Sequence, residues 1–251
     1  GYSGIGKTEY TFWTAKRNAE LWNKVCYVSL ELPKEDMIHR ICTARAWVSK
    51  WEFQTNNFTD TQREIMDAKY DELISLSDRL AIVEPKDHSL EQVIQTIRNY
   101  YDFGVRLFYI DNLDKVTLAS AGNDENKRHW DITSKLQDLK NELHICIVLI
   151  HHSSKKAKWT MSDVPSGLEG MRGSQKIVDN CTNCFEIFRD MSWDDPLEHN
   201  VTRLFQVKDT SGWPKGMCKL VFDHWEYKEF IKEEQEAKVM KMQSDNKDKP
   251  F

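Results

Sequence analysis

Apolar residues recur along the chain at two different intervals, one typical of helices and the other of buried strands. Phe12, Ala15, Ala19 and Trp22 are spaced by three or four positions, which predicts a helix that is broken at residues 23–24. The same spacing predicts further helices over residues 33–48, 62–77, 89–100 and 132–143. Each of these helices would turn one apolar face toward a core.

Short, continuous runs of apolar residues separate these helices. They are predicted to be strands over residues 25–30, 80–83, 105–111 and 145–150. Strands buried on both faces read as unbroken apolar runs, and here they alternate with helices. The sequence therefore predicts an α/β fold with a mostly parallel central sheet flanked by helices. Antiparallel strands at the C-terminal edge are predicted over residues 183–188, 201–207 and 219–222.

Several polar segments interrupt or follow this pattern. Residues 49–61 are expected to form a loop or surface excursion, and residues 117–128 a mobile loop. Residues 153–176 carry several Lys and Arg residues, and a connection of that length is usually functional or disordered. The end of the chain is highly charged, which predicts a frayed helix and a disordered tail. We therefore expect one domain over residues 1–230 and a tail over residues 231–251.

Composition limits the classes of protein and partner. A chain of 251 residues is long enough for one large α/β domain. The net charge of −5 argues against a basic coat over the whole surface, although it allows a local basic channel. No apolar run approaches bilayer-spanning length, so no membrane partner is expected. Cys181-x-x-Cys184 lacks a second pair at zinc spacing, so buried, reduced cysteines are expected there rather than a metal site.

The chain opens with a phosphate-binding motif. Its first eight residues match G-x-x-x-x-G-K-[ST], in which glycines let the backbone approach a phosphate and a following helix presents its positive end. Lys7 is expected to reach the β- and γ-phosphates, and the Thr8 hydroxyl to hold Mg²⁺. The predicted nucleotide-binding residues are Gly1, Ser3, Gly4, Ile5, Gly6, Lys7 and Thr8. A strand precedes this motif in such folds, so the first strand is expected to lie upstream of Gly1.

A second signal for a nucleotide site lies in the run over residues 105–111. This apolar and aromatic run ends in Asp111, which is the form of a Walker B strand. A central parallel strand would place that carboxylate at the C-terminal edge of the sheet, where ligands bind in open α/β folds. We therefore predict that Asp111 holds Mg²⁺ through its water shell.

The order of motifs resembles that of a known family. The chain contains, in this order, Ser-Leu-Glu-Leu-Pro at residues 29–33, Asp111, the pair His151-His152, Leu-x-Gly-Met-Arg-Gly-Ser at residues 168–174, and Lys-Asp-Thr at residues 208–210. This order resembles the RecA-like motor domain of DnaB-type ring replicative helicases, especially the phage primase–helicase and Twinkle branch. The resemblance runs from Gly1 to about Phe230 and implies a RecA-like P-loop NTPase fold.

The resemblance also implies roles for individual residues. Glu31 matches the carboxylate that activates the attacking water, and Lys7 belongs to the same catalytic set. One of His151 and His152 matches the γ-phosphate sensor, and the offset from the strand end favours His152. The residues that match the part of the family facing a central channel and touching single-stranded DNA are Lys155, Lys156, Lys158 and Arg172.

One position departs from the family pattern. The family carries Lys-x-Arg near residue 208, and its Arg enters the neighbouring subunit's site as a finger, whereas this chain has Lys208 followed by Asp209 and Thr210. Lys208 is our candidate for the trans cation, with Lys215 and Arg203 as alternatives. A ring with weak ATPase activity would also explain the missing Arg, because such a finger contributes several powers of ten in rate.

The implied function is an ATP-driven DNA helicase that works as a hexameric ring. Its cofactors would be ATP, or another NTP or dNTP, and Mg²⁺. Its partners would be single-stranded DNA, identical subunits, and a primase, polymerase or loader, in the cytoplasm or alternatively the mitochondrial matrix. Two alternatives stay open. A RecA-like recombinase or mediator would form an open filament, and a RecA-like regulatory ATPase would not depend on the basic loop for DNA binding.

Overall fold

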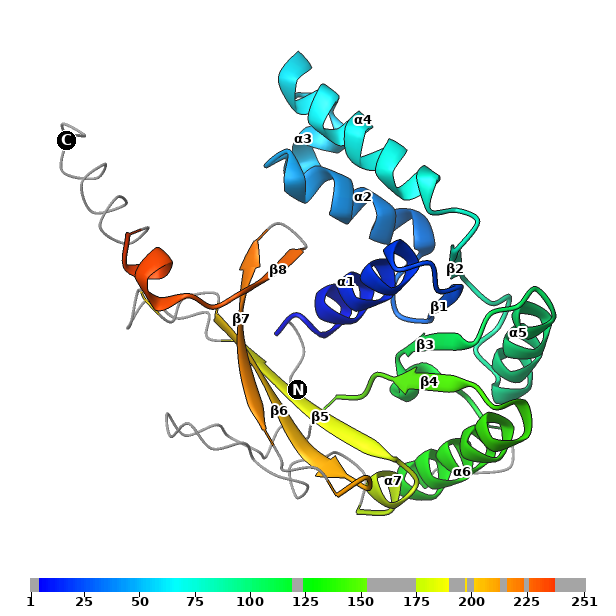
Figure 1. Ribbon diagram of the computed structural model, residues 1–251. Helices are drawn as coiled ribbons and strands as arrows, with labels where there is room; N and C mark the ends of the chain where they lie inside the picture. Colours follow the sequence, from blue (N-terminus) through cyan, green and yellow to red (C-terminus); the bar gives the residue numbers. More distant parts are fainter. Residues whose placement is uncertain are drawn as a thin grey trace.

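The protein folds into two separate four-stranded sheets with helices around them (Figure 1). The computed structural model describes residues 5–118, 124–152, 175–189, 197, 201–212, 216–223 and 226–237. Within these residues, no helix combines the length and the apolar character that crossing a bilayer requires. The mixed architecture agrees with the predicted α/β class.

The first sheet is entirely parallel and carries the strands predicted from the apolar runs. It contains β1 (Val25–Ser29), β2 (Leu80–Val83), β3 (Leu107–Asp111) and β4 (Cys146–Leu149), in the spatial order β2-β1-β3-β4. Ser29 pairs with Asp111, so β1 and β3 end at the same level. The carboxyl ends of the central strands therefore meet at one edge, where α/β sheets bind ligands.

Helices cover both faces of this sheet. One face carries α1 (Lys7–Glu20), α2 (Lys34–Arg45) and α4 (Asp60–Ser75), and the other carries α5 (Leu90–Asp102) and α6 (Glu125–Leu143). Strand β1 is buried along its whole length because its residues alternate between the two cores. Val25 and Tyr27 pack with α1 and α2, whereas Cys26 and Val28 pack with α5 and α6.

The second sheet is antiparallel and contains the C-terminal strands. A short helix, α7 (Gln175–Asp179), precedes β5 (Asn183–Arg189), β6 (Val201–Asp209), β7 (Met217–Asp223) and β8 (Glu226–Glu229), which lie in that order. These strands form a sheet of their own beside α1 (Figure 1). Strand β8 was missed, because no strand was predicted beyond residue 222. In β8 only Tyr227 is buried, so the segment lacks an apolar run.

Two further local predictions were wrong. Residues 49–61 were expected to be a loop, but they contain α3 (Lys50–Gln54) and the start of α4. Capping boxes at Ser49 and Thr59 begin these helices, and the pattern S/T-x-x-E/Q was present in the sequence. Trp22 was placed in the apolar stripe of the first helix. It instead follows the helix end, is 78% exposed, and lies under the Arg79 guanidinium at 4.2 Å.

Some predicted segments lie outside the described residues. They are residues 119–123 of the expected mobile loop, residues 153–174 of the basic segment, and residues 238–251 of the tail. The expected loop over 117–128 is shorter than predicted at its far end, since Asp124 caps α6 at Glu125.

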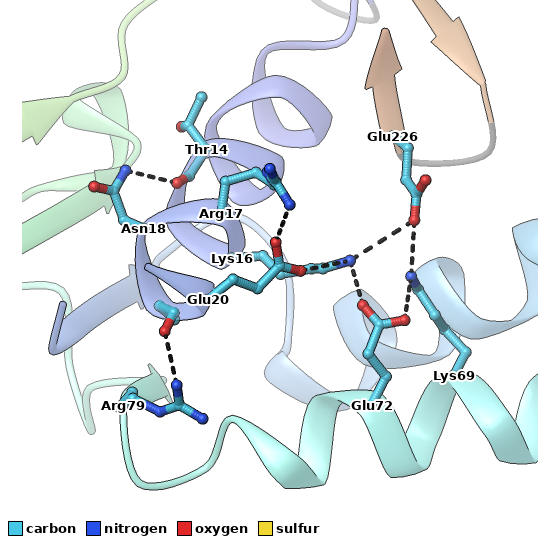
Figure 2. A network of polar contacts seen from close by, with 10 residues as sticks. Thr14, Lys16, Arg17, Asn18, Glu20, Lys69, Glu72, Arg79 and Glu226 are labelled. Atoms are coloured by element: carbon cyan, nitrogen blue, oxygen red, sulfur yellow. Dashed lines mark hydrogen bonds and ion pairs between the residues drawn. The ribbon is translucent and has the colours of Figure 1, made fainter. Parts of the chain in front are cut away.

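An ion-pair network joins α1, α4 and β8 (Figure 2). Lys16 of α1 contacts Glu72 and lies 3.3 Å from Glu20 and 3.7 Å from Glu226. Lys69 of α4 lies 2.7 Å from Glu72 and 3.2 Å from Glu226. Both lysine side chains are buried, at 8% and 6% exposure, so the carboxylates offset the cost of removing two ammonium groups from water. The network therefore ties the antiparallel sheet to the helices of the parallel one.

We predict that Glu226→Gln lowers the free energy of unfolding by about 1 kcal/mol at neutral pH. The expected loss is small because, although the Lys69 side chain is buried, the Glu226 side chain is 34% exposed. Burial alone would raise the pKa of Glu226, but Lys69 and Lys16 lower it overall from its ordinary value of 4.5. A carboxylate with a lowered folded pKa stabilises the protein above its unfolded pKa, and this stabilisation disappears as the pH falls through the folded value.

The variant should therefore lose less stability on acidification below pH 4.5 than the wild type. Urea unfolding at a series of pH values measures this difference. Glu64→Gln, on the exposed face of α4, is the matched control. Equal acid sensitivity of the Glu226→Gln variant and the wild type would show that the network does not contribute.

Candidate nucleotide-binding site

The phosphate-loop motif leads directly into α1. Gly6 is the residue before this helix and has φ 93°, a left-handed conformation that glycine adopts without strain. The first turn of α1 leaves backbone N–H groups without helical partners, and an anion can accept bonds from them. Ile5 is the first described residue of the motif, and Gly1, Ser3 and Gly4 lie outside the described residues.

Asp111 at the end of β3 lies beside the first turn of α1. The Thr8 hydroxyl donates to Asp111 Oδ2 at 2.7 Å, and the Tyr27 hydroxyl donates to the same oxygen at 2.9 Å. Burial raises the pKa of Asp111 above its ordinary value, since the side chain is 2% exposed. Tyr27 was not predicted as a site residue, because its position inside an apolar strand gives no sign of this contact.

The pair Thr8–Asp111 fits the donor set of a magnesium ion. Mg²⁺ takes oxygen ligands, and a hydroxyl and a carboxylate are both hard oxygen donors. Among the described residues, Asp111 Oδ1 is buried and has no hydrogen-bond partner. A buried carboxylate oxygen without a partner is costly, and a hydrated cation would satisfy it.

A chain of polar contacts crosses the sheet edge from Glu31 to Lys7. Asn112 Nδ2 donates to Glu31 Oε2 and also lies 3.1 Å from His152 Nε2. His152 Nδ1 lies 2.9 Å from Lys7 Nζ. Glu31 follows β1, Asn112 follows β3 and His152 follows β4, so the parallel order brings the three together. Asn112 was missed by the sequence analysis, although it directly follows Asp111.

The two adjacent histidines point to different surroundings. His152 faces Lys7 and Glu31, whereas His151 Nδ1 lies 3.3 Å from Asp114 Oδ1. Burial and the nearby Lys7 charge lower the pKa of His152, so its ring is neutral at neutral pH. A charged Lys7 can only donate, so Nδ1 of His152 accepts from it. The other ring nitrogen, Nε2, lies 3.1 Å from Asn112 Nδ2 and 3.5 Å from Glu31 Oε2.

The antiparallel sheet also reaches the phosphate loop. Arg189, at the end of β5, packs against Gly6. Its guanidinium donates to Thr202 Oγ1 at 3.0 Å and to the Tyr227 hydroxyl. The guanidinium carbon lies 3.9 Å from the centre of the Phe222 ring. The Tyr227 hydroxyl in turn lies 3.3 Å from the carbonyl oxygen of Gly6. No local sequence signal marks Arg189 or Tyr227, because each depends on the packing of the two sheets.

The remaining predicted residues do not join this cluster in the described part of the chain. Lys208 Nζ donates to the carbonyl oxygens of Val178 at 2.6 Å and Asp179 at 3.4 Å, at the end of α7 of the same chain. The predicted DNA-binding residues Lys155, Lys156, Lys158 and Arg172, and the alternative cation Lys215, lie outside the described residues.

Comparisons with known proteins agree with this architecture. The sequence profile of a family described as "DnaB-like helicase C terminal domain" matches residues 1–232. A solved structure described as an ATPase domain superposes with a TM-score of 0.80 at 18% identity, covering 92% of this chain and 82% of that one. Another, "The Structure Of A DnaB-Like Replicative Helicase And Its Interactions With Primase", gives a TM-score of 0.78 at 19% identity, covering 90% of this chain.

These matches differ in what they establish. At such low identities the structural likeness shows the fold, which is the predicted RecA-like one. The chain covers 55% of the second structure, or about half of its length. Among curated proteins, no sequence match was found.

We predict that Gly6→Ala destabilises the protein more than Gly212→Ala does. Both glycines have positive φ, 93° and 82°, so each alanine incurs about 1–2 kcal/mol of backbone strain. At Gly212 nothing lies near the new Cβ, whereas at Gly6 it would come within 2.6 Å of Arg189 Cζ. The guanidinium would have to leave Thr202 and Tyr227. Thermal and urea unfolding of both variants measure the difference.

A double-mutant cycle with Arg189→Ala isolates the steric part. In the Arg189→Ala background, the extra cost of Gly6→Ala over Gly212→Ala should largely disappear. If the extra cost persists, the contact between Gly6 and Arg189 is not its cause.

Proposed function

Because this chain belongs to the DnaB-like helicase C-terminal domain family, we propose that it hydrolyses a nucleoside triphosphate to move along single-stranded DNA and to unwind duplex DNA. One observation supports this most directly. Lys7, Thr8, Glu31, Asp111 and His152 come from four separate segments, and they are linked by contacts at one edge of the parallel sheet. A phosphoryl-transfer site requires this combination of cation, hydroxyl, carboxylates and a polar sensor.

In this proposal each group has a separate role. Gly6 and the first turn of α1 hold the phosphates through backbone N–H groups, and the Lys7 ammonium contacts the β- and γ-phosphates. Thr8 and Asp111 hold Mg²⁺, which neutralises charge on the phosphates when it is bound. ATP is the proposed nucleotide, and another NTP or dNTP fits the same phosphate contacts.

Glu31 is the proposed base that orients and activates water. Its side chain is 34% exposed, so water can reach it, and Asn112 holds one of its oxygens. The backbone N–H of Glu31 donates to the carbonyl oxygen of Asp111 at 3.2 Å, which fixes the carboxylate near the proposed magnesium ligand. A base at this position would face the terminal phosphate held by Lys7.

His152 is the proposed sensor of the γ-phosphate. Lys7 donates to one nitrogen of the ring, and Asn112 and Glu31 surround the other. When a phosphate takes over the Lys7 ammonium, His152 Nδ1 loses its donor, and the ring must find a new partner. Because the basic segment begins directly after this residue, a change at His152 would be passed to the proposed DNA-binding loop.

The assembly follows from the same proposal. We propose a hexameric ring with nucleotide between subunits, single-stranded DNA in its centre, and a primase, polymerase or loader as further partners. Lys208 is the proposed trans cation. To act in a neighbouring site, its ammonium must leave the carbonyl oxygens of Val178 and Asp179, so its use would be coupled to movement of α7.

We predict that Glu31→Gln lowers the rate of ATP hydrolysis by about 10²–10⁴-fold, because the amide cannot accept a proton from water. ATP binding should be nearly unchanged, because Lys7, Thr8 and Asp111 remain in place. Lys7→Ala should instead weaken binding and abolish hydrolysis while the fold is retained. Steady-state hydrolysis and binding of a fluorescent nucleotide separate the two effects. Glu91→Gln, exposed on α5, is the control, and full turnover by Glu31→Gln would refute the assigned role.

We also predict that single-stranded DNA stimulates the ATPase and that the protein unwinds a forked duplex. Lys155→Ala together with Lys156→Ala should weaken DNA binding and reduce its salt dependence by about 0.7 in log–log slope for each lost phosphate contact. Lys34→Ala with Lys50→Ala, both exposed on other elements, is the matched control. An ATP hydrolysis rate that single-stranded DNA does not change would favour the regulatory alternative. Open filaments in electron micrographs would favour the recombinase alternative.

A further inference from the structure

A second cluster of polar side chains adjoins the proposed nucleotide site, because His151 and His152 are consecutive residues. It contains Asp114 from the 3₁₀ turn Leu113–Lys115, His129 from α6, and His151 just after β4. The candidate ligand atoms of the three all lie within 4.8 Å of one another. We propose that these residues form a binding site for a divalent transition metal ion, and for Zn²⁺ in particular.

The separations between donor atoms suit a metal better than a set of hydrogen bonds. His129 Nε2 lies 3.4 Å and His151 Nδ1 3.3 Å from Asp114 Oδ1. These separations are longer than ordinary hydrogen bonds of about 2.7–3.2 Å between nitrogen and oxygen. Bonds of about 2.0–2.1 Å to a tetrahedral Zn²⁺ place neighbouring donors about 3.3–3.4 Å apart. Two of the three edges of the ligand triangle therefore already have the required length.

Burial gives an independent reason to expect a ligand. The His129 side chain is 0% exposed, His151 is 6% exposed and Asp114 is 15% exposed. Among the described residues, neither carboxylate oxygen of Asp114 accepts a hydrogen bond of ordinary geometry, and Nδ1 of His129 has no partner. A carboxylate that is buried without hydrogen bonds is costly, and coordination to a cation would offset this cost.

The charge states also suit coordination. Burial lowers the pKa of His129 to about 4, so its ring is neutral at neutral pH and retains a nitrogen lone pair. Burial alone would raise the pKa of Asp114, but the neighbouring histidines hold it at about 2, so the carboxylate is ionised. Arg128 is the competing group, since its Nη2 lies 3.4 Å from His129 Nε2. Its side chain is 25% exposed and also lies 3.9 Å from Glu125, toward which it can turn.

A ligand set of two imidazoles and one carboxylate indicates which class of metal ion would bind. Imidazole nitrogen favours Zn²⁺, Co²⁺ and Ni²⁺ over Mg²⁺, which prefers oxygen ligands only. Three protein ligands leave a fourth tetrahedral position for water. A bound ion would tie the end of β4 to α6 and to the turn that follows β3. His152, the proposed sensor, is the next residue along the chain, so the ion would restrict the backbone that carries it.

The test is a metal titration of the purified protein after treatment with a chelator, without nucleotide and with excess Mg²⁺. Co²⁺ is the probe because its tetrahedral complexes absorb in the visible range. We expect saturation at about one Co²⁺ per chain, displacement by Zn²⁺, no near-ultraviolet cobalt–thiolate band, and a rise in melting temperature. His151→Ala and Asp114→Asn should each weaken binding by at least about tenfold.

Two controls locate the ion. His144→Asn removes an imidazole outside the cluster at a position with φ 52°, which Asn tolerates, and binding should not change. Cys181→Ser with Cys184→Ser should also leave binding unchanged. The wild-type titration decides the question even if His129→Ala, at a fully buried position, fails to fold. The proposal is wrong if the wild type shows no saturable binding, or if His151→Ala and Asp114→Asn bind as tightly as the wild type.

This result does not depend on the proposed helicase activity, because the titration contains no ATP and no DNA. A protein that binds Co²⁺ in the cluster but does not unwind DNA would contradict only the proposed function. A protein that unwinds DNA but binds no metal in the cluster would contradict only this inference.

Discussion

Two backbone hydrogen bonds at the edge of the parallel sheet position the acidic side of the site. The N–H groups of Leu30 and Glu31 both donate to the carbonyl oxygen of Asp111, at 2.6 Å and 3.2 Å. The chain therefore leaves β1 while it is still bonded to the last residue of β3. Because these bonds belong to the backbone, they hold Glu31 close to Asp111 whatever the side chains do. The contacts from Glu31 through Asn112 to His152 depend on this pairing.

The antiparallel sheet packs against Gly6, the residue that precedes α1. Arg189 fills the space beside Gly6, and Tyr227 reaches the carbonyl oxygen of the same glycine. The buried ion pairs of Lys16 and Lys69 with Glu226 hold β8 against α1 and α4. The glycine is thus required for two reasons, its backbone conformation and the guanidinium that packs on it. The C-terminal strands therefore pack against the last glycine of a motif that lies at the other end of the chain.

The end of β4 joins two polar clusters through one peptide bond. His152 faces Lys7 and the proposed nucleotide, whereas His151 faces Asp114 and His129. The two rings contact different groups although their residues are adjacent in the chain. This separation gives each histidine a distinct surrounding and a distinct proposed role.

The order of most helices and strands and the position of Asp111 at the end of a strand could be predicted from the sequence, because periodicity is a local property. Short elements were missed where local signals were weak, as in β8, where only Tyr227 is buried. The surroundings of the two histidines, the bridging position of Asn112 and the packing of Arg189 on Gly6 were decided by tertiary structure alone. Each of them depends on contacts between segments that are far apart in the sequence. The periodicity of apolar residues indicates local structure and does not predict such contacts.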